Sequence, residues 1–485
     1  MGRFSAHITS TRLYIAGAIA LLICAVFSKG YHHFDEHFQI LEFAALKLQM
    51  ATAADMPWEY TTKMRSGIQP FLVVGLYKLI GLLGTPNPFI IALLLRVISA
   101  IAAFFTSYKL VTTFGSEVNN KYYLRLFLPL SFLLWFDVYN AVRFSSENWS
   151  AICLALAVCV LSSSKQSNLT SLILSGLLMG FGVLIRFQAG FMIAGVLLWL
   201  LIIKKESIAR VAWLVTVIIL VIALGVLIDK WLYGVWTLSC WNYFDQNILQ
   251  DKVSGFGVHP WWYYFVETFK DAIPPFSLLF IGGLFGFLII KPKHIFSFLL
   301  VPFLVVHLLI GHKELRFMFP VIYFLPLCVT VTFQYVTQKY NVSYSNSFIS
   351  RILIYSFSLA HLTVLLIVMF KPADSYIGLY EKIYNQYAGP TVLYYENENP
   401  YNRVLDIHFY KRANLCIRKV NTLNDIALPA DTTVLVATTQ NNIDETVNLP
   451  HTCVYASLPN WVNHFNYNNW LARTKIWHVY EIKPQ

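Results

Sequence analysis

Apolar residues gather along this chain in long blocks rather than in short alternating runs. Most blocks have the length of an α-helix that crosses the hydrocarbon layer of a bilayer, about 17 to 25 residues. The blocks predict helices over residues 12–28, 67–84, 88–110, 122–140, 147–163, 170–186, 189–203, 209–231, 273–290, 295–311, 317–336 and 349–370. The first block is expected to span the membrane, because no clear small-residue cleavage site follows it. The pattern predicts an all-α polytopic membrane protein with about 11 to 12 membrane segments.

The pattern changes at Lys371. Residues 371–485 contain short β-branched and aromatic runs between polar stretches, as in Thr391–Tyr395, Thr433–Ala437 and Ile476–Ile482. Such runs predict strands. We therefore expect a membrane domain over residues 1–370, followed by a small soluble α/β appendage over residues 371–485.

Composition excludes several classes of protein. Hydrophobic residues make up 57% of the chain and charged residues only 13%, and the mean hydropathy is +0.56. Soluble globular proteins carry about 25% charged residues. An ordinary soluble enzyme, a disordered chain and a disulfide-rich secreted module are therefore excluded. The net charge is +11, from 36 Lys and Arg against 25 Asp and Glu, and many of the basic residues lie near the ends of the apolar blocks.

Those positions predict an orientation, because cytoplasmic loops are enriched in Lys and Arg. The basic residues near segment ends are Lys204, Lys205, Arg210, Lys291, Lys293, Lys339 and Arg351. With them inside, loop 232–272, the stretch 311–316 and the appendage face the periplasm or the ER lumen. Arg3 and Arg12 place the N-terminus inside as well, so loop 29–66 is also expected outside. Six blocks then lie between outside loop 29–66 and inside loop 204–210, where an odd number of crossings is required. At least one of the six is expected to be re-entrant or half-length.

The seven cysteines predict no metal site. Four of them lie in apolar segments, where packing is their usual role. Cys416 and Cys453 both fall in the appendage, and an oxidising compartment would permit them to pair. The sequence shows no CxxC or His/Cys cluster, and we expect neither a metal nor a cofactor.

Carboxylates gather in the first outside loop, which contains Asp35, Glu36 and Glu42. On an α-helix, Asp35 shares a face with Gln39 and Glu42, whereas Glu36 points elsewhere. One carboxylate can then enter a cavity while its neighbour serves a second role. The alternative is a solvated amphipathic helix with Asp35 as its N-cap, and the residues alone leave the two interpretations balanced.

A second outside cluster combines aromatic residues with hydrogen-bonding groups between Asp229 and Phe265. An interfacial aromatic belt accounts for residues 261–265. It does not account for the interleaved His259, amides, carboxylates and glycines, which suit sugar hydroxyls and the apolar faces of sugar rings.

Basic residues mark a third cluster, in which His312, Lys313 and Arg316 precede an apolar helix. Snorkelling to lipid headgroups is the plain interpretation. A phosphate or pyrophosphate site is the other. Arg143 and Arg186 add charge at membrane depth, where ionisable residues are usually functional.

These three clusters together resemble glycosyltransferase family 22, the polyprenyl-linked mannosyltransferases of GPI-anchor and N-glycan assembly. His33-Phe34-Asp35-Glu36-His37-Phe38-Gln39 with Glu42 resembles the motif H-P-D-E-x-F-Q-x-x-E, with Phe34 in place of Pro. Trp58-Glu59-Tyr60 with Arg65-Ser66 is similar to T-W-E-[YW]…R-S. Residues 229–265 resemble D-S-x-F-Y-G…Y-G-x-H-P-W-x-W-Y-F, with Lys230 in place of Ser, and residues 312–320 match H-K-E-x-R-F-x-[FL]-P. Residues 143–147 follow R-T-x-S-N-x-x-E only loosely. The strongest similarity is to the third-mannose enzymes of GPI assembly and their bacterial relatives.

The resemblance implies a GT-C fold and a set of roles. It implies Asp35 as the general base that takes the proton of an acceptor hydroxyl, with Glu36 beside it as the second catalytic carboxylate. It implies donor-phosphate binding by His312, Lys313, Arg316 and Arg186. The expected substrate-binding or loop-shaping residues are His33, Gln39, Glu42, Trp58, Glu59, Arg65, Arg143, Tyr233, His259 and Trp261.

The expected function is transfer of a hexose, with mannose as the first candidate, from a polyprenyl- or dolichyl-phosphate donor to a glycan or glycolipid acceptor. The family implies inversion at the sugar carbon and an active site facing the periplasm or the ER lumen, in a bacterial inner membrane or the ER membrane. Membrane lipid is an expected partner and nucleic acid is not. The alternatives are a lipid-linked saccharide flippase, which predicts internal repeats that the sequence lacks, and a receptor whose appendage is the working part.

Overall fold

The computed structural model describes residues 2–163, 168–341, 348–439, 449–466 and 474–483. Its chain divides into two compact units. The first, here called the helical unit, comprises residues 1–28, 62–71 and 93–371. The second, here called the mixed unit, comprises residues 29–61, 72–92 and 372–485. Each of the twelve apolar blocks forms helix, because a helix satisfies its own backbone hydrogen bonds in an apolar surrounding.

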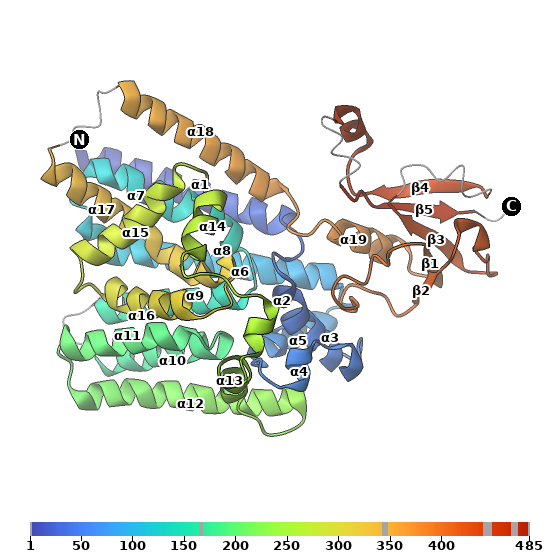
Figure 1. Ribbon diagram of the computed structural model, residues 1–485, viewed down its shortest axis with the longest axis horizontal. Helices are drawn as coiled ribbons and strands as arrows, with labels where there is room; N and C mark the ends of the chain where they lie inside the picture. Colours follow the sequence, from blue (N-terminus) through green and yellow to red (C-terminus); the bar gives the residue numbers. More distant parts are fainter. Residues whose placement is uncertain (1, 164–167, 342–347, 440–448, 467–473, 484–485) are drawn as a thin grey trace. The chain divides into compact units, whose positions relative to one another are not determined.

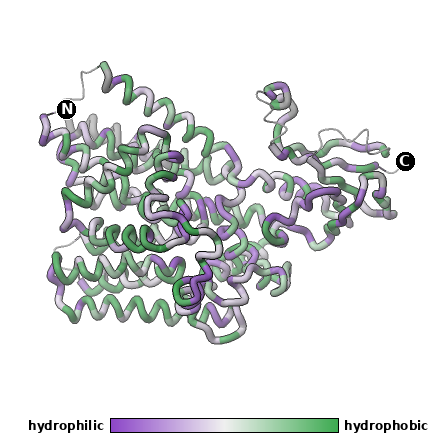
Figure 2. Tube along the Cα trace, viewed as in Figure 1, coloured by the Kyte–Doolittle hydropathy of each residue, from purple (hydrophilic) through white to green (hydrophobic). Residues whose placement is uncertain are grey.

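The longer helices follow the apolar blocks closely (Figure 1). They are α1 (Gly2–Phe27), α5 (Ile68–Gly81), α6 (Pro88–Phe114), α7 (Lys121–Leu133), α8 (Trp135–Ala141), α9 (Ser146–Ser162), α10 (Leu169–Ile185), α11 (Ala189–Ile202), α12 (Ile208–Tyr233), α15 (Ser277–Ile290), α16 (Ile295–Leu309), α17 (Leu325–Lys339) and α18 (Phe348–Phe370). Figure 2 shows that apolar residues dominate the helices α10, α11 and α12.

The loops contain shorter elements. They are α2 (Phe34–Glu36), η1 (His37–Glu42), α3 (Phe43–Lys47), η2 (Ala53–Asp55), α4 (Trp58–Thr61), η3 (Gly115–Glu117), α13 (Ser239–Phe244), η4 (Asp245–Leu249), η5 (Lys252–Phe256), α14 (Tyr263–Asp271), η6 (Leu315–Phe324), α19 (Ile377–Gln386), η7 (Leu423–Asp425) and η8 (Asn460–Phe465).

The structure breaks some predicted segments. Block 122–140 is two helices, because Leu134 adopts an extended conformation between α7 and α8. Helices α15 and α16 correspond to two separate predicted blocks, and they are bent by 118° about a short connection. Among the described residues, four helices are long and apolar enough to cross a membrane, and the bent pair makes up to five. Helices α5 and α11 have 14 residues each and are shorter than a full membrane span, while the expectation of a re-entrant or half-length segment between residues 67 and 203 stays a prediction.

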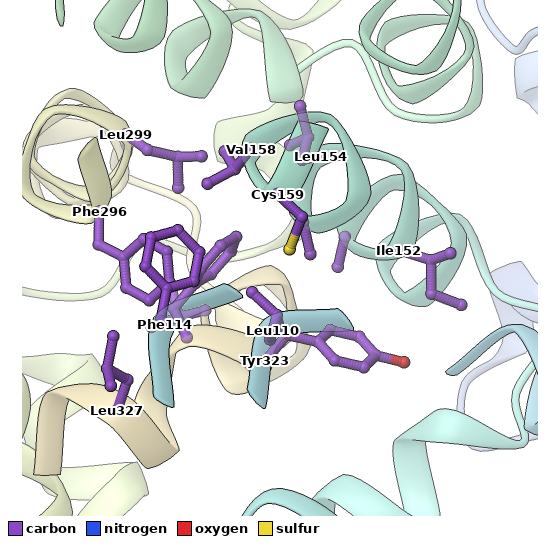
Figure 3. Packing of buried hydrophobic residues seen from close by; sticks show 14 of the residues in the cluster. Leu110, Phe114, Ile152, Leu154, Val158, Cys159, Phe296, Leu299, Tyr323 and Leu327 are labelled. Carbon is purple, nitrogen blue, oxygen red and sulfur yellow. The ribbon is translucent and has the colours of Figure 1, made fainter. Parts of the chain in front are cut away.

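The core of the helical unit contains one large apolar cluster and smaller ones beside it. Figure 3 shows Phe114, Phe296 and Leu299 packing together, with Leu110 and Tyr323 beside them. Elsewhere in this unit α10 packs against α9 and α12. On α10, a Cβ added at Gly176 or Gly180 would lie 2.7 Å and 2.6 Å from the Cβ atoms of Val217 and Val221. Only glycine permits α12 to come this close.

The mixed unit contains a five-stranded sheet of order β2-β1-β3-β5-β4 (Figure 1). Its strands are β1 (Thr391–Tyr395), β2 (Leu415–Lys419), β3 (Thr433–Thr438), β4 (His451–Ala456) and β5 (His478–Ile482). Strand β1 pairs in parallel with β2 and β3, whereas β5 pairs antiparallel with β3 and β4. The three predicted strands are confirmed as β1, β3 and β5.

The suggested pairing of Cys416 with Cys453 is wrong. The two residues lie on β2 and β4, the opposite edges of the sheet, and both thiols are free. Four strand spacings separate these edges, roughly 19 Å at about 4.8 Å per strand. A disulfide requires Cα atoms within about 7 Å.

Candidate active site

The first loop of the mixed unit starts with a capped turn. His33 is the N-cap of α2, with an extended backbone at φ −133° and ψ 152°. Its ring Nδ1 accepts a hydrogen bond from the backbone N–H of Asp35 at 3.2 Å. His33 therefore occupies the N-cap position that the solvated-helix alternative gave to Asp35, and that alternative is corrected in this respect.

Asp35 keeps a partly exposed side chain. Its Oδ1 lies 3.6 Å from Nδ1 of His33, and 27% of the side chain is exposed. The neighbouring Glu36 points elsewhere and accepts a hydrogen bond from the backbone N–H of His32 at 2.9 Å. The two carboxylates thus have separate surroundings, as expected.

The next turn is a π-helix over His37–Glu42, which the sequence did not predict. Its wider turn places His37 beside Glu42, five residues on, with Nε2 and Oε1 at 2.8 Å. The expected shared face of Asp35, Gln39 and Glu42 assumed α-helical spacing, and the π-turn changes that spacing. Glu42 is 1% exposed.

Gln39 contacts another predicted residue of the same unit. Its side-chain amide donates to Oε1 of Glu59 at 3.0 Å. Glu59 is buried in the short helix α4, which begins at Trp58. The structure thus connects two motifs of the first loop through one hydrogen bond.

A second set of charged residues lies inside the helical unit. Ser145 is the N-cap of α9, and Glu147 lies in the first turn of that helix. Its carboxylate accepts from Nη1 of Arg186 at 2.7 Å and from Nη1 of Arg316 at 3.2 Å. All three side chains are almost completely buried. A carboxylate placed between two arginines compensates their positive charges, so that the guanidinium groups can remain buried.

The guanidinium group of Arg186 has hydrogen-bond donors that Glu147 does not use. In the part of the chain that the structure describes, its Nε and Nη2 are buried without a hydrogen-bond partner. The guanidinium groups of Arg186 and Arg316 each lie 5.2 Å from the ring centre of Phe317. The buried hydroxyl of Tyr264 also has no hydrogen-bond partner among the described residues, and burial raises the pKa of this group. Such donors suit an incoming anion.

The preceding stretch provides two more predicted residues. His312 bridges the backbone oxygen of Gly257 and Oε1 of Glu314 through its two ring nitrogens, at 2.9 and 3.0 Å. Glu314 also pairs with Arg316. Lys313 is 2% exposed and donates to the backbone oxygens of His259 and Ile310, and burial lowers its pKa. These residues hold loop 257–259 against the charged cluster.

Other predicted site residues have structural contacts within the helical unit. Arg143 is 1% exposed and donates to the backbone oxygen of Ser28 at 2.9 Å. The hydroxyl of Tyr233 donates to the backbone oxygen of Arg65 at 2.6 Å. The guanidinium of Arg65 lies 5.6 Å from the ring centre of Tyr243. Their assignment as substrate-binding residues stays a prediction.

His259 and Trp261 are exposed on loop 257–262. The ring of His259 stacks on that of Tyr263 at 4.3 Å, and Trp261 is 60% exposed. Both remain accessible to a ligand, as the sugar-binding interpretation requires.

Sequence reasoning gave no role to several residues of these sites. Glu147 and Glu314 lie within quoted motifs. The pairing of Glu147 with Arg186 and Arg316 joins segments 39 and 169 residues apart, whereas Glu314 pairs with Arg316 two residues away. Tyr264 stands in an aromatic run that an interfacial belt also explains. Among the described residues, no group of three His, Cys, Asp or Glu side chains could hold a metal ion.

Comparison with known proteins decides the family. The family model for Alg9-like mannosyltransferases matches residues 13–412, most of the chain. This chain belongs to the Alg9-like mannosyltransferase family. The match includes all four motifs of the predicted resemblance, which is thereby confirmed.

Individual relatives share about a quarter of their aligned residues with this chain. GPI alpha-1,2-mannosyltransferase 3 of Bos taurus is 25% identical over 321 residues, covering 64% of this chain and 56% of that protein. GPI mannosyltransferase 3 of Drosophila melanogaster is 26% identical over 320 residues, covering 64% and 54%. The chain thus spans little more than half the length of these relatives.

A solved structure shows the same fold. ArnT from Cupriavidus metallidurans, solved with undecaprenyl phosphate, aligns over 98% of this chain and 99% of its own. The TM-score is 0.54 at 11% sequence identity. The chain is therefore a mostly helical, multi-pass membrane protein with the GT-C fold and a C-terminal mixed sheet, as expected.

Proposed function

We propose that this protein is an integral-membrane glycosyltransferase. It transfers a hexose, with mannose as the first candidate, from a polyprenyl-phosphate donor to a glycan or glycolipid acceptor. Family membership and the names of the bovine and Drosophila relatives support mannose. The undecaprenyl phosphate bound to ArnT, a protein of the same fold, supports the lipid phosphate.

One observation carries the proposal most strongly. Arg186 keeps Nη1 on Glu147, whereas its Nε and Nη2 are buried with no hydrogen-bond partner in the described part of the chain. Leaving buried donors unpaired costs free energy, so a polar ligand at this position is favoured. Two adjacent guanidinium nitrogens match two oxygens of one phosphate group.

Each of these groups has a role in the proposed transfer reaction. The acceptor hydroxyl oxygen forms a bond to the anomeric carbon, and the bond from that carbon to the phosphate oxygen breaks. The electron pair leaves with the polyprenyl phosphate, whose charge Arg186 and Arg316 stabilise, with Lys313 and His312 supporting them. Asp35 accepts the hydroxyl proton as general base, and attack opposite the leaving group inverts the sugar carbon. Glu36, the residue after Asp35, is the second catalytic carboxylate in this proposal.

The proposal includes an orientation. The basic clusters at 204–210, 291–293 and 339–351 face the cytoplasm, so loops 29–66 and 232–272 act on the periplasmic or luminal side. The membrane is a bacterial inner membrane or the ER membrane.

Transfer of radiolabelled mannose tests the proposal. Membranes that contain the wild type or Asp35→Asn are given polyprenyl-phosphate-linked mannose with a lipid extract as acceptor source. The wild type is expected to produce a labelled glycolipid, and Asp35→Asn is expected to produce none. The asparagine keeps the size of the side chain and removes the proton acceptor.

Asp55→Asn is the matched control, because it makes the same chemical change in the same loop outside the proposed machinery. It should retain wild-type transfer. Turnover retained in Asp35→Asn would overturn the role of Asp35. Failure of the wild type with the mannose donor, and success with another lipid-linked hexose, would overturn mannose alone. Movement of the intact donor across the membrane without transfer would favour a flippase.

A further inference from the structure

The carboxylate of Glu42 lies at the centre of a fully buried hydrogen-bond arrangement in the mixed unit. Its Oε1 accepts from Nε2 of His37 at 2.8 Å and from the backbone N–H groups of His408 and Phe409 at 3.0 and 3.1 Å. Three donors converge on a single carboxylate oxygen. These three contacts fix Oε1 to the protein itself, while Oε2 is buried without a hydrogen-bond partner among the described residues.

The donors come from two distant parts of the sequence. His37 lies in the same π-turn as Glu42, two residues after Asp35. His408 and Phe409 lie more than 360 residues further along the chain, in the stretch before β2. Glu42 therefore connects the turn that contains Asp35 to the C-terminal part of the mixed unit.

His37 is held on both faces of its ring. It is fully buried, and its ring stacks on Tyr31 at 5.0 Å and on Tyr410 at 5.5 Å. Tyr410 in turn stacks on Phe89 at 4.7 Å. A ring fixed between two aromatic side chains keeps its nitrogen directed at Glu42, so the π-turn has one arrangement.

Contacts at the start of the loop join the same two segments. Arg403 pairs with Asp374 at 2.9 Å, and its guanidinium lies 3.6 Å from the ring centre of Tyr376. The same guanidinium lies 5.7 Å from the ring centre of Phe34, the residue before Asp35. The backbone N–H of Ala373 also donates to the oxygen of Lys29 at 2.8 Å. Residues 373–410 thus contact the loop on both sides of Asp35.

We propose that Glu42 is a positioning residue that fixes the Asp35 turn against residues 403–410. This inference rests on the proposed function, because it assigns Asp35 the base role. The C-terminal part of the chain then belongs to the catalytic apparatus through Glu42, without touching the reacting atoms. Displacement of a catalytic group by about 1 Å can lower turnover on the order of 100-fold.

Steady-state kinetics of the full-length protein, with polyprenyl-phosphate-linked mannose, provide the first test. Glu42→Ala removes the common acceptor and should lower kcat on the order of 100-fold, with the donor KM within about twofold. Glu42→Gln keeps an oxygen for the two backbone N–H groups and should recover kcat to within about tenfold of the wild type. A donor KM that rises with kcat unchanged would mark Glu42 as a substrate contact and overturn the proposal.

Hydrogen exchange of the amides of residues 31–42 provides a second test that needs no activity. Exchange should accelerate in Glu42→Ala and stay close to wild type in Glu42→Gln, because only the alanine leaves the donors unpaired. Unchanged exchange in Glu42→Ala would overturn the proposal. If the wild type transfers no mannose, the proposed function fails while this measurement still decides whether Glu42 fixes the turn.

Two further variants complete the design. Val436→Ala, which opens a cavity in the sheet of the same unit, should lower thermal stability without accelerating exchange in residues 31–42. If Glu42→Ala does not accumulate in membranes, Arg403→Met replaces it and removes the second connection. It should lower kcat relative to the wild type and accelerate exchange in residues 31–42, and an unaltered kcat with unaltered exchange would overturn the proposal.

Discussion

Glu147 of the helical unit and Glu42 of the mixed unit are both buried, but their hydrogen-bond donors are of different kinds. Glu147 is neutralised by the guanidinium groups of Arg186 and Arg316. Glu42 is stabilised by a histidine ring and two backbone N–H groups. Side-chain cations can transfer part of their hydrogen bonding to a new anion, whereas backbone N–H groups remain where the fold places them. The first arrangement suits ligand binding and the second suits permanent structure.

Removal of Glu147 should have the largest effect on stability. Glu147→Ala leaves the buried Arg186 without its ion pair, a change that typically costs about 3 to 5 kcal/mol. Thermal unfolding in detergent measures the loss. Added polyprenyl phosphate should restore more stability to this variant than to the wild type, because the anion takes the vacant position. Equal stabilisation of both proteins would contradict the assignment of the Glu147 cluster to ligand binding. Glu147→Gln, which keeps the size of the side chain, serves as the control.

Removal of Arg186 tests the cationic partner of Glu147 in the same cluster. Arg186→Met should lower turnover about 100- to 1000-fold, the usual cost of one donor to a developing negative charge. Arg186→Lys should recover part of the loss, because an ammonium keeps the charge without the planar pair of donors. Mannose transfer assays measure both variants. Arg210→Met, which removes a half-exposed arginine paired with Glu206, is the control and should leave turnover unchanged.

The smallest effect should come from a carboxylate near the surface. Hydrogen bonds from the side chain and backbone of Thr52 hold the pKa of Asp55 below its usual range. A lowered folded-state pKa stabilises the fold above the unfolded value of about 3.9, and this contribution disappears as the pH falls through the folded value. Asp55→Asn should therefore be less stable than the wild type near pH 6 by at most about 1 kcal/mol. The difference should vanish in acid, and a difference that grows toward low pH would contradict this account.

The sequence predicted the helices well and the interruptions poorly. Apolar blocks identify helices because each residue in lipid or in the core contributes to hydropathy independently of its partners. The break at Leu134 and the π-turn at His37 leave no interruption in the hydropathy pattern, whereas the connection between α15 and α16 falls between two predicted blocks. Strands β2 and β4 escaped prediction for a related reason: each is an edge strand with several exposed residues, so its apolar signal is weak.

The charged residues of the site show the same limit. The sequence marks Lys313 and Arg316 as basic residues before an apolar helix and Arg186 as a cation at membrane depth, and the family resemblance implies a common role for them. Their counter-charges were not recognised, because Glu147 lies 39 residues from Arg186 and 169 from Arg316. Glu42 was predicted in the right loop, but its partners at positions 408 and 409 could not be inferred from local spacing.

The close approach of α12 to Gly176 and Gly180 has a consequence for how the bundle holds together. Lipid tails are as apolar as the side chains they would replace, so exclusion of water contributes nothing to this contact within the bilayer. Attraction comes instead from dispersion between closely packed atoms, and this attraction falls steeply over less than an ångström. The association of α10 with α12 therefore depends on how closely their two surfaces fit. Where the surfaces do not fit, lipid competes with the neighbouring helix for the contact.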